Sequence, residues 1–140
     1  LLEGITNEEK FYSYAEVVAN YYCLQYERMM SKTTREQSYR QARQVLWWFC
    51  RTGDTYLPFS LSRIGQLTSL DEDEAPFDHA TVLHGSRKIK DEVPSVFDLR
   101  QDIKNIAQTL GFNFGKHGRK YVTTIGTQRR KESEEEHATA

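Results

Sequence analysis

The side chains best suited to recognition stand together in one tetrapeptide, Asp78-His79-Ala80-Thr81. Aspartate is a strong helix N-cap, so the tetrapeptide predicts the first turn of a helix that runs to about Glu92. The first turn of a helix offers free backbone N–H groups, which favour a nearby anion, and outward side chains that can contact a ligand. A simple cap is the alternative role for Asp78. The two roles are compatible, because the second carboxylate oxygen stays available.

The other reactive residues predict neither catalysis nor a metal site. His79 and His84 have no third ligand at a suitable spacing, so no metal is expected, and a buried or solvated histidine is the alternative for His84. Cys23 and Cys50 are far apart in apolar helical stretches and are expected to be core thiols. No nucleophile stands beside a base and no carboxylate pair shares a surface, so we expect no enzyme activity and no cofactor.

Hydrophobic spacing predicts two long helices in the first half of the chain. Thr6-Asn7-Glu8-Glu9 has the spacing of a capping box, and apolar residues at helical intervals extend the first predicted helix to about Met30. A polar segment, Ser31–Arg35 (the 31–35 loop), separates it from the second predicted helix. The adjacent Trp47 and Trp48 lie on an apolar stretch of that helix, so we expect them in the core and not stacked on bases.

The middle of the chain predicts a helix-turn-helix. Gly53 ends the second helix, and Ser60 is a good N-cap for a short helix. The segment Thr68–Phe77 (the acidic loop) holds four consecutive acidic residues, Asp71–Glu74, and predicts an exposed connection. The helix capped by Asp78 follows, so two helices joined by a loop form the expected pair.

The end of the chain predicts one more helix and a tail. Ser95 and Asp98 have capping-box spacing, and the helix is expected to stop at Gly111. Five helices without a strand pair predict an all-α fold, with residues 1–111 as one domain and 112–140 as a basic, then acidic, flexible tail. Tyr121–Ile125 could form one short strand, and the basic part of the tail could lie along phosphate. Four apolar residues are expected to line the last helix: Phe97, Ile103, Ile106 and Leu110.

The charge distribution permits a nucleic-acid partner although the formal net charge is only −1. Basic residues gather between Arg28 and Arg43 and again between Arg87 and Lys90, whereas acidic residues gather in 71–74 and 132–136. Segregation of this kind can leave one positive face, which phosphate binding requires. A solvated mixture of charges is the alternative. No run of apolar residues is long enough for a membrane helix, so a cytoplasmic protein is expected, associated with the nucleoid if it binds DNA.

The order of these motifs resembles the C-terminal DNA-binding domain of the bacterial replication initiator DnaA, over roughly Tyr14 to Thr109. The most specific part is Asp78-His79-Ala80-Thr81-Val82-Leu83-His84 with Arg87-Lys88-Ile89, because the family's recognition helix opens with Asp-His-Ser/Thr-Thr-Val. The other parts are Val18-Ala19-Asn20-Tyr21-Tyr22 through Met29-Met30-Ser31-Lys32, Ala42-Arg43-Gln44-Val45, and Ser60-Leu61-Ser62-Arg63-Ile64-Gly65.

The resemblance implies a helical fold similar to the tryptophan repressor and a set of DNA contacts. Asp78, His79, Ala80 and Thr81 would read bases in the major groove, although Ala80 replaces the family's usual hydroxyl residue. Arg35 is the candidate for the family's minor-groove arginine, and an ordinary loop charge is its alternative. The candidate phosphate contacts are Lys32, Arg43, Arg87 and Lys88.

Two departures from the family lie just before the recognition helix. The family has a short turn between Gly65 and Asp78, whereas this chain has the acidic loop. Phe77 stands where the family has an arginine, so the role of that arginine is not carried over. Four carboxylates would repel phosphate if they pointed at DNA.

The sequence therefore predicts sequence-specific binding of double-stranded DNA, in replication or in transcription regulation. The chain has no Gly-x-x-x-x-Gly-Lys-Ser/Thr loop, so no ATPase activity is expected of it. It could be a fragment of a longer protein or a stand-alone relative from a phage or mobile element, with other replication or regulatory proteins as partners. The alternative is a protein-interaction module that kept the fold, lost DNA binding, and uses the acidic loop as its contact.

Overall fold

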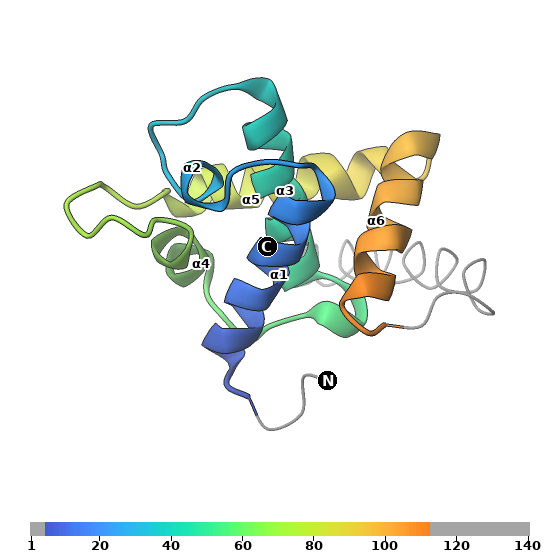
Figure 1. The fold of residues 1–140 in the computed structure, drawn as a ribbon, viewed down its shortest axis with the longest axis horizontal. Coiled ribbons are helices and arrows are strands. Elements are labelled where there is room, and N and C mark those ends of the chain that lie inside the picture. The colour runs from blue at the N-terminus through green and yellow to red at the C-terminus, as the bar shows by residue number, and fades with distance from the viewer. Residues whose placement is uncertain (1–4, 113–140) are drawn as a thin grey trace, which may run out of the picture.

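The computed structural model describes residues 5–112, which form helices joined by loops (Figure 1). This described part contains no strand, so the all-α prediction is confirmed, with six α-helices where five were expected. The segment 121–125 and the rest of the predicted tail from residue 113 on lie outside the described residues, whereas Phe112, the first residue of that predicted tail, packs against the core. None of the helices in residues 5–112 is long and apolar enough to cross a membrane. The helices are α1 (Asn7–Tyr21), α2 (Tyr26–Met29), α3 (Gln37–Arg51), α4 (Leu61–Leu67), α5 (His79–Glu92) and α6 (Phe97–Thr109), with a 3-10 turn at Gly53–Thr55.

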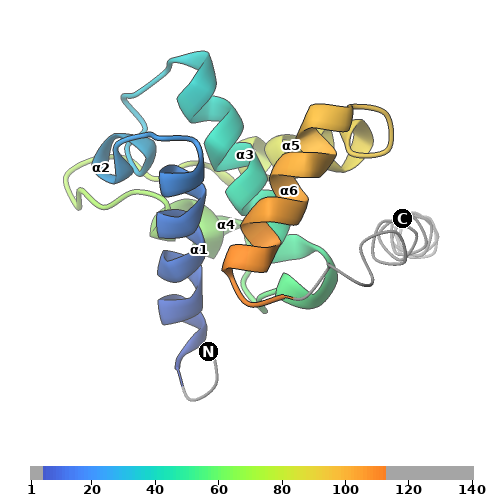
Figure 2. The same cartoon turned by 45° about the vertical axis from the view of Figure 1, so that its right-hand side comes forward.

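Helix α3 is the centre of the fold, and Figure 2 shows it with α1 and α6 on one side and α5 crossing behind. It packs against α1, α2 and α5. Every residue from Val45 to Cys50 is buried, because this half of the helix is covered on all sides. Trp47 is 2% exposed and Trp48 is fully buried, which confirms that both belong to the core.

Helix α1 begins as predicted but ends earlier. Thr6 and Glu9 form the capping box, with the Glu9 backbone N–H donating to Thr6 Oγ1 at 3.1 Å. The predicted continuation to Met30 was wrong, because Cys23 adopts a left-handed backbone conformation with φ 56° and the chain turns before α2. The turn carries Met29 and Met30 into the core, where they are 0% and 1% exposed.

The two cysteines have different environments. Cys50 is fully buried, as predicted, and burial raises the pKa of its thiol well above the usual range. Cys23 is exposed, so its predicted core position was wrong. The reason is the early end of α1, which places Cys23 in a surface turn.

Helices α4 and α5 form the predicted helix-turn-helix pair. Ser60 caps α4, with the Arg63 backbone N–H donating to Ser60 Oγ at 3.1 Å. The α4 helix approaches the chain just before α5 so closely that a Cβ atom on Gly65 would lie 2.0 Å from the backbone oxygen of Phe77. A glycine is therefore required at position 65 for this approach.

Both ends of the acidic loop are attached to Trp47 of α3. The Trp47 indole N–H donates to Thr68 Oγ1 at 3.0 Å, and the Trp47 ring meets the Phe77 ring edge to face with centroids 5.3 Å apart. The loop leaves the core and returns to it at the same side chain, so its extra residues need not move α4 away from α5. Figure 1 shows the segment between α4 and α5 projecting on the side of the molecule where α2 lies.

Helix α6 differs from the prediction at its start. Its N-cap is Val96, without a side-chain cap, and the Ser95 hydroxyl donates to the Glu92 carbonyl oxygen instead of capping the helix. Phe97 was expected to line the helix but is 60% exposed, because it lies at the first position, beyond the edge of the core. The helix ends at Thr109 and Gly111 has φ 93°, which confirms the predicted stop.

Candidate nucleic-acid interface

The first turn of α5 is exposed and is capped by Asp78. Asp78 Oδ1 accepts a hydrogen bond from the Thr81 backbone N–H at 2.7 Å. Hydrogen bonds from Thr81 are the main cause that lowers the pKa of Asp78, so its carboxylate is ionised at neutral pH. A carboxylate has two oxygens and about four acceptor sites, so the cap leaves it able to accept further hydrogen bonds.

The other three residues of this turn lie at the surface to different degrees. His79 and Thr81 are exposed, and Ala80 is half-buried. Val82, the next residue, is fully buried and fixes the turn on the core. The predicted base-reading residues Asp78 to Thr81 therefore stand together at the start of α5, and three of the four are exposed.

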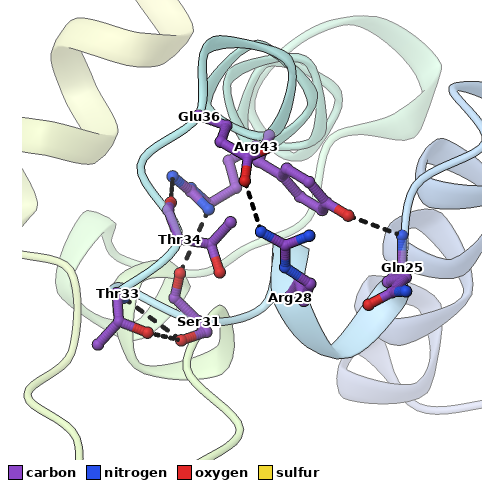
Figure 3. Close-up of polar contacts among 8 residues, drawn as sticks. Gln25, Arg28, Ser31, Thr33, Thr34, Glu36 and Arg43 are labelled. Carbon is purple, nitrogen blue, oxygen red and sulfur yellow. Dashed lines mark hydrogen bonds and ion pairs between the residues drawn. The ribbon is translucent and has the colours of Figure 1, made fainter.

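The 31–35 loop lies over the start of α3 and is held by Arg43 (Figure 3). The Arg43 guanidinium donates to the carbonyl oxygens of Met29 at 3.1 Å, Ser31 at 3.3 Å and Thr34 at 2.7 Å. It also lies over the Phe77 ring, 5.1 Å from the ring centroid.

Arg43 itself does not belong to the exposed surface. Its side chain is buried, with the residue only 3% exposed, and its N–H groups are directed at backbone carbonyls. Burial lowers the pKa of Arg43 to about 10, which still leaves the guanidinium charged at neutral pH. The expected phosphate contact needed surface exposure, so it is corrected: Arg43 shapes the loop from the interior.

Lys32 connects the 31–35 loop to the start of α5. Its Nζ atom donates to the Pro76 carbonyl oxygen at 3.4 Å, and its charge is among the smaller causes that lower the pKa of Asp78. Lys32 and Arg35 are both exposed. Within residues 5–112, the Arg35 side chain makes no hydrogen bond or ion pair, so the fold presents it at the surface without fixing its direction.

A hollow of about 370 Å³ lies between α3 and α5, beside this exposed turn. Lys88, a predicted phosphate contact, lines this hollow. Arg87, the other predicted phosphate contact on α5, is exposed but does not line the hollow, and it interacts with other residues. Sequence reasoning missed three polar residues of the hollow, Arg40, Gln44 and His84. Their spacing of three to four residues along each helix is the signal that could have found them. The hollow is lined by Arg40, Arg43, Gln44, Trp47, Thr81, His84, Gly85 and Lys88.

The surface so assembled has the composition of an anion-binding face. Lys32, Arg40 and Lys88 are exposed cations around the first turn of α5. In the described part of the chain, no three histidine, cysteine or acidic side chains come together as metal ligands. The exposed side chains of this surface can donate and accept hydrogen bonds, and its cations attract negative charge. These are properties of a surface that binds a charged ligand.

A comparison with protein families agrees with this geometry. A family model described as the bacterial dnaA protein helix-turn-helix matches residues 15–89. The match begins within α1 and ends near the end of α5, so it includes the 31–35 loop, the hollow between α3 and α5, and the exposed turn.

Proposed function

The chain belongs to the bacterial DnaA helix-turn-helix family, a family of DNA-binding domains, and on this premise we propose that it binds double-stranded DNA at a specific sequence. The observation that carries the proposal is the exposed first turn of α5 with cations around it. In helix-turn-helix proteins the second helix enters the major groove, and its N-terminal residues contact base edges.

In this proposal the first turn of α5 reads the bases. The ionised Asp78 carboxylate accepts from a cytosine amino group while it caps the helix, and His79 donates to or accepts from a base edge. The methyl groups of Ala80 and Thr81 contact a thymine methyl. Support comes from the exposure of His79 and Thr81.

The surrounding cations bind phosphate and set the position of the protein on the duplex. Lys32, Arg87 and Lys88 are the predicted contacts, and Arg40 joins them because it lines the same hollow as Lys88. Arg35 at the end of the 31–35 loop enters the neighbouring minor groove, whose negative potential attracts arginine. Such a protein acts at the nucleoid, in replication or in transcription regulation.

The test is a binding titration of His79→Ala and Lys32→Ala on a duplex selected from a random pool and on a scrambled duplex. We expect His79→Ala to cost about 1–3 kcal/mol on the selected duplex and little on the scrambled one. Lys32→Ala should weaken both alike and reduce the salt dependence of binding by about one phosphate contact. Equal losses on both duplexes for His79→Ala would remove its role in base reading.

The same titration separates DNA binding from a protein-interaction module. Phosphate binding releases counterions, so affinity for any duplex should fall steeply as salt rises. No mobility shift with any duplex at low salt would contradict the proposed function. It would leave the protein-interaction module, with the acidic loop as its contact, as the alternative to test.

A further inference from the structure

The acidic loop contacts the 31–35 loop near its end, and near its start it contacts Met30, the residue just before that loop. Near its start, the Leu70 backbone N–H donates to the Met30 carbonyl oxygen at 3.2 Å. Near its end, Pro76 accepts from Lys32 Nζ, and the Glu74 side chain reaches the backbone of the 31–35 loop. Two segments that are far apart in the sequence are therefore joined side by side, next to the first turn of α5.

The Glu74 carboxylate is the centre of this contact. The Ser31 hydroxyl donates to its two oxygens at 3.1 and 3.2 Å, and the Thr33 backbone N–H donates to Oε1 at 3.3 Å. The Lys32 backbone N–H donates to the same oxygen. One carboxylate thus accepts from three consecutive residues. Asp71, Glu72 and Asp73 of the same loop are exposed, whereas Glu74 is half-buried.

The opposite side of the 31–35 loop is held by Arg43, which donates to the carbonyl oxygens of Ser31 and Thr34. A carboxylate therefore binds the N–H groups of the loop, and a guanidinium binds its C=O groups. Hydrogen bonds to charged groups are stronger than neutral ones, so the loop is fixed from two sides. Arg43 also stacks on Phe77, the last residue of the acidic loop. Because Phe77 directly precedes Asp78, this contact links the 31–35 loop and its two charged partners to the start of α5.

We propose that Glu74 is a positioning residue for DNA binding: its carboxylate fixes the 31–35 loop so that Lys32 and Arg35 are held beside the recognition helix. The inference rests on the proposed function, because it assigns Glu74 a part in the same contact with DNA. A loop of short polar residues that is already ordered loses less conformational entropy on binding. The acidic loop then strengthens DNA binding through Glu74, although its charge alone would oppose it.

The sign of the effect makes the proposal testable. Glu74→Ala removes a negative charge near DNA, so simple repulsion predicts tighter binding, whereas positioning predicts weaker binding. We expect about a tenfold loss of affinity for the selected duplex, the size of one charge-assisted hydrogen bond. Glu72→Ala is the matched control, since it removes the same charge from an exposed side chain of the same loop. It should leave affinity unchanged or slightly higher.

The conservative variant Glu74→Gln separates shape from charge. Its amide oxygen can still accept from the Lys32 and Thr33 backbone N–H groups, so we expect affinity between those of the natural protein and Glu74→Ala. If removal of charge alone mattered, Glu74→Gln and Glu74→Ala would behave alike. Thermal melting followed by circular dichroism checks that all three variants are folded.

A second measurement needs no DNA. In the free protein, the amide hydrogens of Lys32 and Thr33 should exchange with solvent about tenfold faster in Glu74→Ala, while those of α3 should not change. Unchanged exchange, or tighter DNA binding by both Glu74→Ala and Glu72→Ala, would overturn the inference. If the natural protein binds no duplex, the proposed function fails and the DNA role of Glu74 with it. The exchange rates then still decide whether Glu74 holds the 31–35 loop.

Discussion

Arg40 and Arg43 lie on the same helix and have opposite surroundings. Arg40 is exposed at the hollow between α3 and α5, whereas Arg43 is 3% exposed and donates to three backbone carbonyl oxygens. A buried cation without its acceptors would be very costly, so the position of the 31–35 loop and the burial of Arg43 depend on each other. At this scale, one arginine serves stability and its neighbour is available to a ligand.

Substitution of these two arginines should separate stability from binding. Arg43→Ala removes a buried charged donor from three carbonyl groups, so we expect the free energy of unfolding to fall by about 2–4 kcal/mol. Arg40→Ala should change it by less than about 0.5 kcal/mol and should weaken DNA binding on all duplexes. Urea unfolding measures the first effect, and the duplex titration measures the second.

Arg43→Lys is the control for charge. A lysine keeps the positive charge but cannot direct a planar set of donors at three carbonyls, so most of the loss of stability should remain. Full stability in Arg43→Lys would mean that charge alone is needed. Unchanged stability in Arg43→Ala would contradict the structural role.

Single residues also show what the sequence could predict. The cap at Asp78 follows from local chemistry, since an aspartate before a helical pattern needs only the next turn to be satisfied, and the structure confirms it. The burial of Arg43 could not be predicted in this way. Its acceptors belong to residues 29, 31 and 34, which come within reach only when the chain folds back after α2. Glu74 was missed for the same reason, because its donors are in a distant segment.

At the scale of elements, the pairing of α4 with α5 depends on one glycine. A Cβ atom at Gly65 would lie 2.0 Å from the Phe77 backbone oxygen and 2.9 Å from its carbonyl carbon. Backbone atoms cannot rotate away as a flexible side chain can, so one helix or the other must move. Because Asp78 directly follows Phe77, this movement would change the position of the first turn of α5 relative to α4.

Gly65→Ala should therefore affect both stability and DNA binding. We expect a loss of about 1–3 kcal/mol in the free energy of unfolding, because overpacking against backbone strains the structure. Affinity for the selected duplex should fall together with stability, since the first turn of α5, which is proposed to read the bases, is displaced. The control is Ser62→Ala, an exposed position on the same helix, which should change neither quantity. A stable, fully active Gly65→Ala protein would show that α4 and α5 are not held at this distance.

The helices whose ends carry local signals were predicted well, and the others were not. The caps at Ser60 and Asp78 predicted the starts of α4 and α5, and Gly111, which has φ 93°, predicted the end of α6. The break after α1 was missed, because Tyr22 and Tyr26 continue the helical spacing of apolar residues across it. No glycine or proline marks that turn, and its left-handed residue is Cys23.

At the scale of the whole molecule, the described part of the chain is closed by a contact between α1 and α6. The Tyr21 hydroxyl donates to Asp102 Oδ1 at 2.8 Å, and the Tyr22 hydroxyl donates to Asp102 Oδ2 at 3.0 Å. Figure 1 shows α6 on the opposite side of the molecule from the acidic loop, so this contact lies away from the proposed reading surface. Stability should therefore be adjustable there without a change in DNA binding.

Alkaline pH tests Tyr22 of this contact together with two other tyrosines, Tyr14 and Tyr26. Burial raises the pKa of Tyr14 and of Tyr26 to about 12, and burial followed by the charge of Asp102 raises the pKa of Tyr22 further. Above the ordinary tyrosine pKa of about 10, the unfolded chain loses protons that the folded chain keeps, so the free energy of unfolding must fall as pH rises. Below that pH these tyrosines are neutral in both states, and their contribution to stability is fully present.

Urea unfolding at a series of pH values measures the free energy of unfolding, and tyrosinate absorbance of the folded protein measures the tyrosine pKa values. Asp102→Asn removes the charge that disfavours tyrosinate, so we expect the pKa of Tyr22 to fall in this variant yet stay above its ordinary value, since burial is the larger cause. The variant should also lose about 1–2 kcal/mol at neutral pH, because an amide offers one acceptor oxygen to two hydroxyl groups. Stability that stays constant through about pH 11 would contradict the raised pKa values.

A loss of DNA affinity in folded Asp102→Asn would instead show that the α1–α6 contact and the reading surface are coupled.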